Sequence, residues 1–166
     1  MDILDHIWVD FCHARLGDEY LVLYSGRQKE IRRWFKIVTI LLSAEGIFSA
    51  FKEAKIPTVI SFTVIGIIQL LSTIENQIIR SEKEVEEIGK LRIFYYERSN
   101  KLERLFLEFR DDSIKEDDAR SQLFALRDAA IEIEELDTKL NIKKHRKLFL
   151  KADTLAKKHL NQYYNE

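Results

Sequence analysis

The residue with the most unusual surroundings is Glu45, an acid inside an otherwise apolar stretch. Between residues 34 and 51 the only other charged residue is Lys36, near the start of the stretch. If this stretch crosses a membrane, an ionised carboxylate facing acyl chains is costly, so Glu45 must be neutral, be paired, or face protein or water. Two roles follow: a pore-lining or proton-sensing group, or a protonated glutamate that is hydrogen-bonded to a neighbouring helix.

A second group of chemically capable residues is the basic cluster KKHRK at residues 143–147. Lys143, Lys144 and Arg146 are candidates for contacting a phosphate-bearing ligand, because cations and free backbone N–H groups at a helix start attract phosphate. Against this, cations oppose the dipole at a helix N-terminus, and the preceding acidic segment offers nearby partners. The pattern favours a structural role for the cluster.

A third pattern places His6, Asp10 and His13 at i, i+4 and i+7 of a helix. These residue types bind metals, but a solvated face opposite an apolar stripe explains them better, so we predict no metal and no cofactor. The sequence has no Gly-rich phosphate loop, nucleophile elbow, HExxH or paired-cysteine motif. We therefore expect no enzyme activity.

The element that would hold Glu45 is a helical hairpin. Residues 56–74 are nineteen consecutive residues without a charge, and residues 34–51 form a second apolar segment. At about 1.5 Å of rise per residue, such a segment matches the roughly 30 Å of a bilayer's hydrocarbon core. We predict a transmembrane hairpin over residues 34–74. The alternative is a pair of helices buried on all sides in a soluble bundle.

Aromatic and basic residues around the hairpin predict its orientation. Trp34 lies at the start of the first segment, where aromatic rings prefer the membrane interface. Arg27, Arg32 and Arg33 lie just before it and are expected to contact lipid headgroups. The far end of the hairpin carries only two basic residues, Lys52 and Lys55, with Glu53 between them. By the positive-inside rule, both termini are predicted to be cytoplasmic.

Small and polar side chains give the hairpin two predicted faces. Small residues let helix backbones approach closely in lipid. The predicted packing residues are Ser43, Gly46, Ala50 and Gly66. The predicted pore-lining residues are Glu45, Ser49 and Gln69. Because two helices enclose no interior, a pore requires several copies, and the chain is predicted to be its own partner.

The rest of the chain is also predicted to be helical, since 5 glycines and 1 proline leave little material for turns. A short helix over residues 3–16 is expected to end at Gly17, with Asp18 capping the next helix. The predicted fold is therefore all-α. Its parts are N-terminal helices at residues 1–33, the transmembrane hairpin at 34–74, and a cytosolic helical bundle at 75–166.

Within that bundle, a heptad-like seam predicts one long helix. Its residues recur at alternating spacings of 3 and 4, so we expect a coiled-coil-like rod that continues from the second span to Arg110. The seam consists of Ile78, Ser81, Val85, Ile88, Arg92, Tyr95, Ser99, Leu102, Phe106 and Phe109. A turn follows at residues 111–116. An acidic helix up to residue 140 and a basic helix after Asn141 are expected to pack with complementary charge.

The composition of the chain limits the classes of partner that it is expected to bind. A formal net charge of −1 gives the chain no overall attraction to nucleic acid, so no DNA or RNA duplex is expected. The single Cys12 fits a reducing cytosol. The first 20 residues contain acids throughout, which argues against a cleavable signal peptide.

Three stretches resemble the SLATT family, the two-transmembrane effector domains associated with bacterial nucleotide-second-messenger systems. They read YLVLYSGRQKEIRRWFK at residues 20–36, LRIFYYERSNKLERL at 91–105 and LNIKKHRKLFLKADTLAKKHLNQYY at 140–164. The resemblance lies in the order and character of these stretches, and the family has no catalytic residues to transfer.

The resemblance implies an effector of antiphage defence that oligomerises into a pore and disrupts the bacterial inner membrane. Its trigger would be a nucleotide second messenger or a sensor protein. One alternative is a membrane receptor that binds a cyclic oligonucleotide directly, as in CRISPR-type systems. Another is a membrane-anchored helical scaffold that recruits a partner and conducts nothing.

Overall fold

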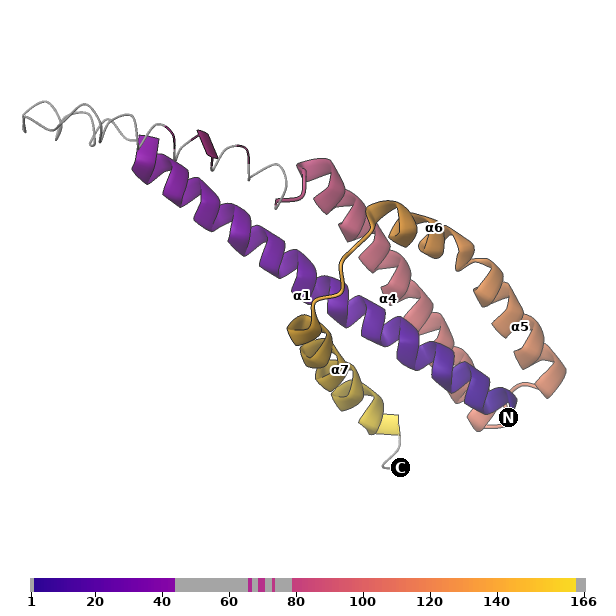
Figure 1. The fold of residues 1–166 in the computed structure, drawn as a ribbon. Helices are drawn as coiled ribbons and strands as arrows, with labels where there is room; N and C mark the ends of the chain where they lie inside the picture. Colours follow the sequence, from indigo (N-terminus) through magenta and orange to yellow (C-terminus); the bar gives the residue numbers. More distant parts are fainter. Residues whose placement is uncertain (1, 44–65, 67–68, 71–72, 74–78, 164–166) are drawn as a thin grey trace, which may run out of the picture. The chain divides into compact units, whose positions relative to one another are not determined.

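The computed structural model describes residues 2–43, 66, 69–70, 73 and 79–163, and these residues form helices and short connections without a strand (Figure 1). The helices are α1 (Ile3–Ser43), α4 (Glu82–Arg110), α5 (Glu116–Asp128), α6 (Ile131–Leu140) and α7 (Arg146–Leu160), with a 3-10 turn at Asn161–Tyr163. The prediction of an all-α fold is confirmed.

The chain divides into two compact units. The bundle unit comprises Met1–Ser25 and Lys83–Glu166, and the second unit comprises Gly26–Glu82. Within the bundle unit, α4, α5, α6 and α7 gather around the first part of α1, as Figure 1 shows. The N-terminal residues therefore belong to the same compact unit as the C-terminal helices.

The helix α1 is continuous from Ile3 to Ser43, so the predicted break at Gly17 is wrong. Gly17 is helical and lies against the ring of Tyr95, where an added Cβ would come 2.5 Å from the ring atom Cδ1. Asp18 is not a helix cap, since its carboxylate pairs with Arg15 and Arg92. Glycine at this position permits close helix packing rather than ending the helix.

Two apolar clusters form the core of the bundle unit. The first gathers around Phe11 of α1 and the second around Tyr24, one on each half of the helix within this unit. The buried residues of α4 are Ile88, Leu91, Ser99, Leu102, Leu105 and Phe106. Four of these six lie on the predicted heptad-like seam and the two others are leucines, so the helical bundle is confirmed.

The predicted rod from the second span to Arg110 is interrupted, because Ile79–Ser81 are not helical and α4 begins at Glu82. Arg32 holds this break: its Nη2 donates to the carbonyl of Arg80 at 2.6 Å, and its Nη1 lies 3.4 Å from the Glu82 carboxylate. In a continuous helix that carbonyl would accept the N–H four residues later. The sequence carries a start signal here, since Ser81 followed by Glu84 matches a capping box.

The predicted acidic helix is divided into α5 and α6 at Ala129 and Ala130, where the Ala130 N–H bonds to the Arg127 carbonyl in a tighter turn. The division lets α5 pack on the first apolar cluster through Leu123 and α6 pack on the second through Ile133. The predicted turn after Arg110 is confirmed. So is the turn at Asn141, which has a left-handed backbone with φ of 43°.

The predicted transmembrane hairpin falls largely outside the described residues, which omit 44–65. Among the helices that are described, none combines the length and the apolar character needed to cross a bilayer.

Candidate functional site in the helical bundle

The bundle unit contains a cavity of about 330 Å³ that brings together residues distant in sequence. Its walls come from α1, α4, α6, the loop after α6 and the start of α7. The polar and aromatic lining residues are His13, Tyr20, Tyr95, Arg98, Glu134, Asp137, Lys144 and Phe149. This is the candidate site, because it combines hydrogen-bonding groups with aromatic walls in a concave space.

The charges that line the cavity balance. Arg98 and Lys144 supply two cations, and Glu134 and Asp137 supply two anions. A ligand with several phosphates would face those two carboxylates and be repelled by them. The lining suits a ligand with both donor and acceptor groups, rather than a polyanion.

Arg98 and Tyr95 bring two polar groups to the cavity wall. The Nε of Arg98 is buried without a hydrogen-bond partner, while its Nη2 lies 3.6 Å from the Asp10 carboxylate. Burial, reinforced by the charges of Asp137 and Glu134, raises the pKa of the Tyr95 hydroxyl. The Tyr95 hydroxyl therefore loses its proton only at a higher pH than an ordinary tyrosine.

The loop that carries Lys144 is fixed to α1 by Tyr20. The Tyr20 hydroxyl donates to the Lys143 carbonyl and accepts from the His145 N–H, both at 3.0 Å. The ring of Tyr24, one turn further along α1, stacks on the His145 imidazole with centroids 6.2 Å apart. Tyr20 thus satisfies two backbone groups of a loop that has no helical partners for them.

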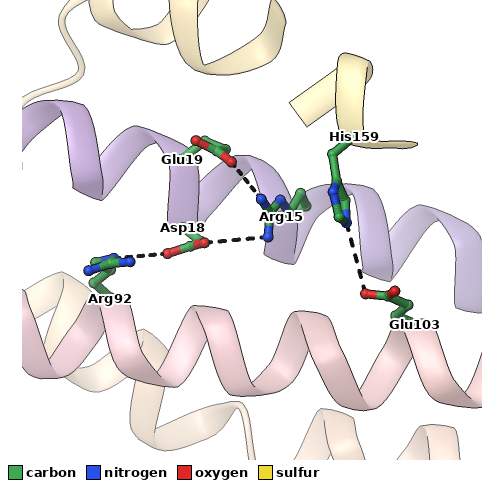
Figure 2. Close-up of polar contacts among 6 residues, drawn as sticks. All are labelled: Arg15, Asp18, Glu19, Arg92, Glu103 and His159. Carbon is green, nitrogen blue, oxygen red and sulfur yellow. Dashed lines mark hydrogen bonds and ion pairs between the residues drawn. The ribbon is translucent and has the colours of Figure 1, made fainter. Parts of the chain in front are cut away.

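Polar contacts outside the cavity lining hold α1, α4 and α7 together (Figure 2). The Asp18 side chain is only 5% exposed, and its two oxygens lie 3.1 Å from Arg92 Nε and 3.7 Å from Arg15 Nη1. Arg15 also donates to Glu19 at 2.7 Å. Figure 2 shows a second contact to α4, in which His159 of α7 lies 3.9 Å from Glu103. A buried carboxylate with two guanidinium partners ties α1 to α4 in one register.

Asp10, which the sequence placed beside two histidines, makes ion pairs instead. Arg127 of α5 contacts both of its carboxylate oxygens, at 2.8 and 3.4 Å. Within the part of the chain that the structure describes, no three His, Cys, Asp or Glu residues are grouped so that they could hold a metal ion.

The three residues predicted to contact phosphate are separated by the fold. Lys144 lines the cavity, whereas Lys143 and Arg146 are exposed and outside its lining. Tyr20 and Arg98, which line the cavity, and Asp18, which pairs with Arg92, were not among the predicted site residues. A local signal existed only for Asp18, which follows Arg15 by three residues on one helix face.

The predicted lipid-contacting arginines lie in the second unit. Arg27 and Arg33 are exposed, while Arg32 is engaged with Arg80 and Glu82. Arg27 also borders a shallow apolar hollow that includes Trp34.

Most of the predicted hairpin residues lie outside the described ranges, namely Glu45, Gly46, Ser49 and Ala50. Ser43 is the last residue of α1. Gly66 and Gln69 are both helical, Gln69 is exposed, and a Cβ added at Gly66 would meet nothing within 4 Å.

No protein-family model, curated protein or solved structure matches this chain.

Proposed function

We propose that the chain is a membrane effector of bacterial antiphage defence, whose hairpins at residues 34–74 assemble into a pore that disrupts the inner membrane. The main support is the apolar surface at the end of α1. Trp34 is 67% exposed and Ile40 65% exposed, and Ile37 and Val38 are also exposed. Contiguous apolar side chains of this size favour contact with lipid or with protein over contact with water.

The exposed arginines beside this surface support the same proposal. Arg27 and Arg33 lie just before or among the apolar side chains of α1, where cations can contact anionic headgroups. One unbroken helix, α1, carries both core residues of the bundle and the apolar end of the second unit. A signal received in the bundle therefore has a continuous helix through which to reach the hairpin.

The bundle cavity is the proposed receiving site for that signal. Its balanced charges favour a ligand, or a segment of a sensor protein, that offers both donors and acceptors. Direct binding of a cyclic oligonucleotide is disfavoured by Glu134 and Asp137. That alternative predicts that changing Lys143, Lys144 and Arg146 to Ala abolishes nucleotide binding, as measured by calorimetry, without loss of helicity.

Release of a self-quenched dye from liposomes tests the pore. The purified chain, reconstituted in anionic liposomes, is expected to release dye, and Glu45→Leu and Gln69→Leu are expected to slow release about tenfold or more because they remove polar lumen groups. Thr63→Val is the matched control, since it removes a polar group that is not assigned to the lumen.

Two outcomes would overturn the proposal. If the chain resists carbonate extraction from membranes yet releases no dye in any condition, it is an anchored scaffold rather than a pore. If carbonate removes it from the membrane, the hairpin is not embedded. Growth arrest on overexpression, relieved by Glu45→Leu, is the expected result in cells.

A further inference from the structure

Two charged surfaces of the bundle unit have the same pattern with opposite signs. Exposed residues on both sides of the turn between α5 and α6 define the acidic stripe, which consists of Phe124, Asp128, Ile131, Glu132 and Glu135. On α7 a basic stripe consists of Lys147, Leu150, Lys151, Leu155 and Lys158. Each stripe holds three like charges and two exposed apolar side chains.

The charged side chains of the two stripes have no ion-pair partners among the described residues. The sequence predicts that the acidic and basic helices pair with each other. In the described residues, however, no ion pair joins α6 to α7, and the six charged side chains of the two stripes make none at all. The exposed apolar residues are large: Phe124 is 53% exposed, Ile131 57% and Leu150 54%.

We propose that the acidic stripe of one copy docks on the basic stripe of another copy of the same chain. The proposal deepens the proposed function, which requires several copies, by naming the surface that joins them outside the membrane. Opposite charges in equal number favour the encounter, and the apolar side chains between them supply contact area. A lipid surface would account for the basic stripe alone and would leave Phe124 and Ile131 uncovered.

Charge reversal tests the docking on the full chain in detergent micelles, with mass measured by light scattering across protein concentrations. Lys147→Glu/Lys151→Glu/Lys158→Glu is expected to weaken self-association roughly tenfold or more, because three attractions become repulsions. Asp128→Lys/Glu132→Lys/Glu135→Lys is expected to do the same. High salt should weaken association of the parent chain.

The two reversed variants also provide a rescue. Each alone carries two stripes of one sign, whereas an equal mixture presents an acidic stripe to a basic one at every contact. The mixture is therefore expected to regain the parent mass. Lys83→Glu/Lys101→Glu/Lys115→Glu is the matched control, since it makes the same change in net charge at exposed lysines outside both stripes. Helicity by circular dichroism verifies that all variants fold.

The proposal is overturned if the parent chain is monomeric, if the reversed variants associate like the parent, or if the mixture does not recover. A loss of binding to anionic vesicles with unchanged mass would make the basic stripe a lipid contact. The experiments distinguish the docking proposal from the pore proposal. If assembly depends on the stripes but no dye is released, the pore is refuted and the docking stands.

Discussion

At the scale of single residues, Gly17 is the position where the smallest side chain matters most. It allows the Tyr95 ring to lie against the backbone of α1, on the wall of the candidate cavity. Gly89, which is also helical, has nothing within 4 Å of the place a Cβ would occupy. Two helical glycines of one chain therefore have opposite structural roles.

Replacing each glycine by alanine is expected to change stability in opposite directions. Gly17→Ala forces the Tyr95 ring to move and should lower the free energy of unfolding by about 1–3 kcal/mol. Gly89→Ala should raise it by roughly 0.5–1 kcal/mol, because alanine favours the helix and nothing is displaced. Urea unfolding followed by circular dichroism measures both. Equal effects of the two changes would refute the close contact.

A single side chain, Tyr163, is expected to make the free energy of unfolding depend on pH. Its hydroxyl donates a short hydrogen bond to Glu103, and burial together with this carboxylate raises the pKa of Tyr163 to about 12. The folded state thus retains a proton that the unfolded state loses near pH 10. The contribution to stability is complete below pH 10 and is lost as the pH rises towards 12.

We expect the free energy of unfolding to fall between pH 10 and 12, and to fall less in Tyr163→Phe, which has no hydroxyl to ionise. Urea midpoints across this range measure the difference. Tyr96→Phe, at an exposed tyrosine, is the control and should follow the parent. A Tyr163→Phe curve parallel to that of the parent would contradict the pKa shift.

At the scale of elements, one side chain of α1, Tyr20, makes two hydrogen bonds to the loop between α6 and α7. Tyr20 is 8% exposed and supplies both hydrogen bonds to the loop backbone. The loop in turn places Lys144 at the cavity. One residue of the cavity wall, Tyr20, therefore fixes a loop that is more than a hundred residues away in the sequence.

Tyr20→Phe keeps the ring and removes both hydrogen bonds, which leaves a partly buried carbonyl and N–H without these partners. We expect a loss of about 1–3 kcal/mol in the free energy of unfolding and faster hydrogen exchange at the His145 amide. Exchange within α5, which packs on the other apolar cluster, serves as the internal reference. An unchanged His145 exchange rate would mean that the loop is held by other contacts.

At the scale of the whole molecule, the bundle unit is built from two separate parts of the chain. Both of its apolar clusters are made of residues from Ile3–Tyr24 and from the part after residue 83. The second unit contributes no residue to either cluster. The core of the bundle therefore does not require residues 26–82.

A shortened chain, in which a flexible Gly/Ser linker replaces residues 26–82, is expected to fold with a cooperative urea transition. The reason is that both clusters keep all of their members. Circular dichroism and the dispersion of amide resonances measure the outcome. Swapping Phe11 to Ala in the shortened chain should abolish the transition, and a shortened chain without cooperative unfolding would refute an independent core.

How far the sequence predicts this protein can be judged from α4. Its apolar spacing identifies the buried residues Ile88, Leu102 and Phe106 correctly. An amphipathic helix packs its apolar face against the rest of the protein, whichever elements its neighbours are. The turns after Arg110 and at Asn141 were also predicted correctly, because the Asp, Ser and Asn residues there favour turns through local interactions. The start of α4 was missed although Ser81 and Glu84 signal it.

Local pattern alone determined that this chain is helical, which faces of its helices are apolar and where its charges of each sign gather. Only the tertiary structure decided that Gly17 packs against Tyr95 rather than ending the helix, that Asp18 pairs with Arg92, and that Lys144 lines one cavity with Glu134 while Lys143 does not. Those outcomes depend on contacts between residues many positions apart. Helical periodicity specifies a face for each side chain, but it does not specify which distant face will meet it.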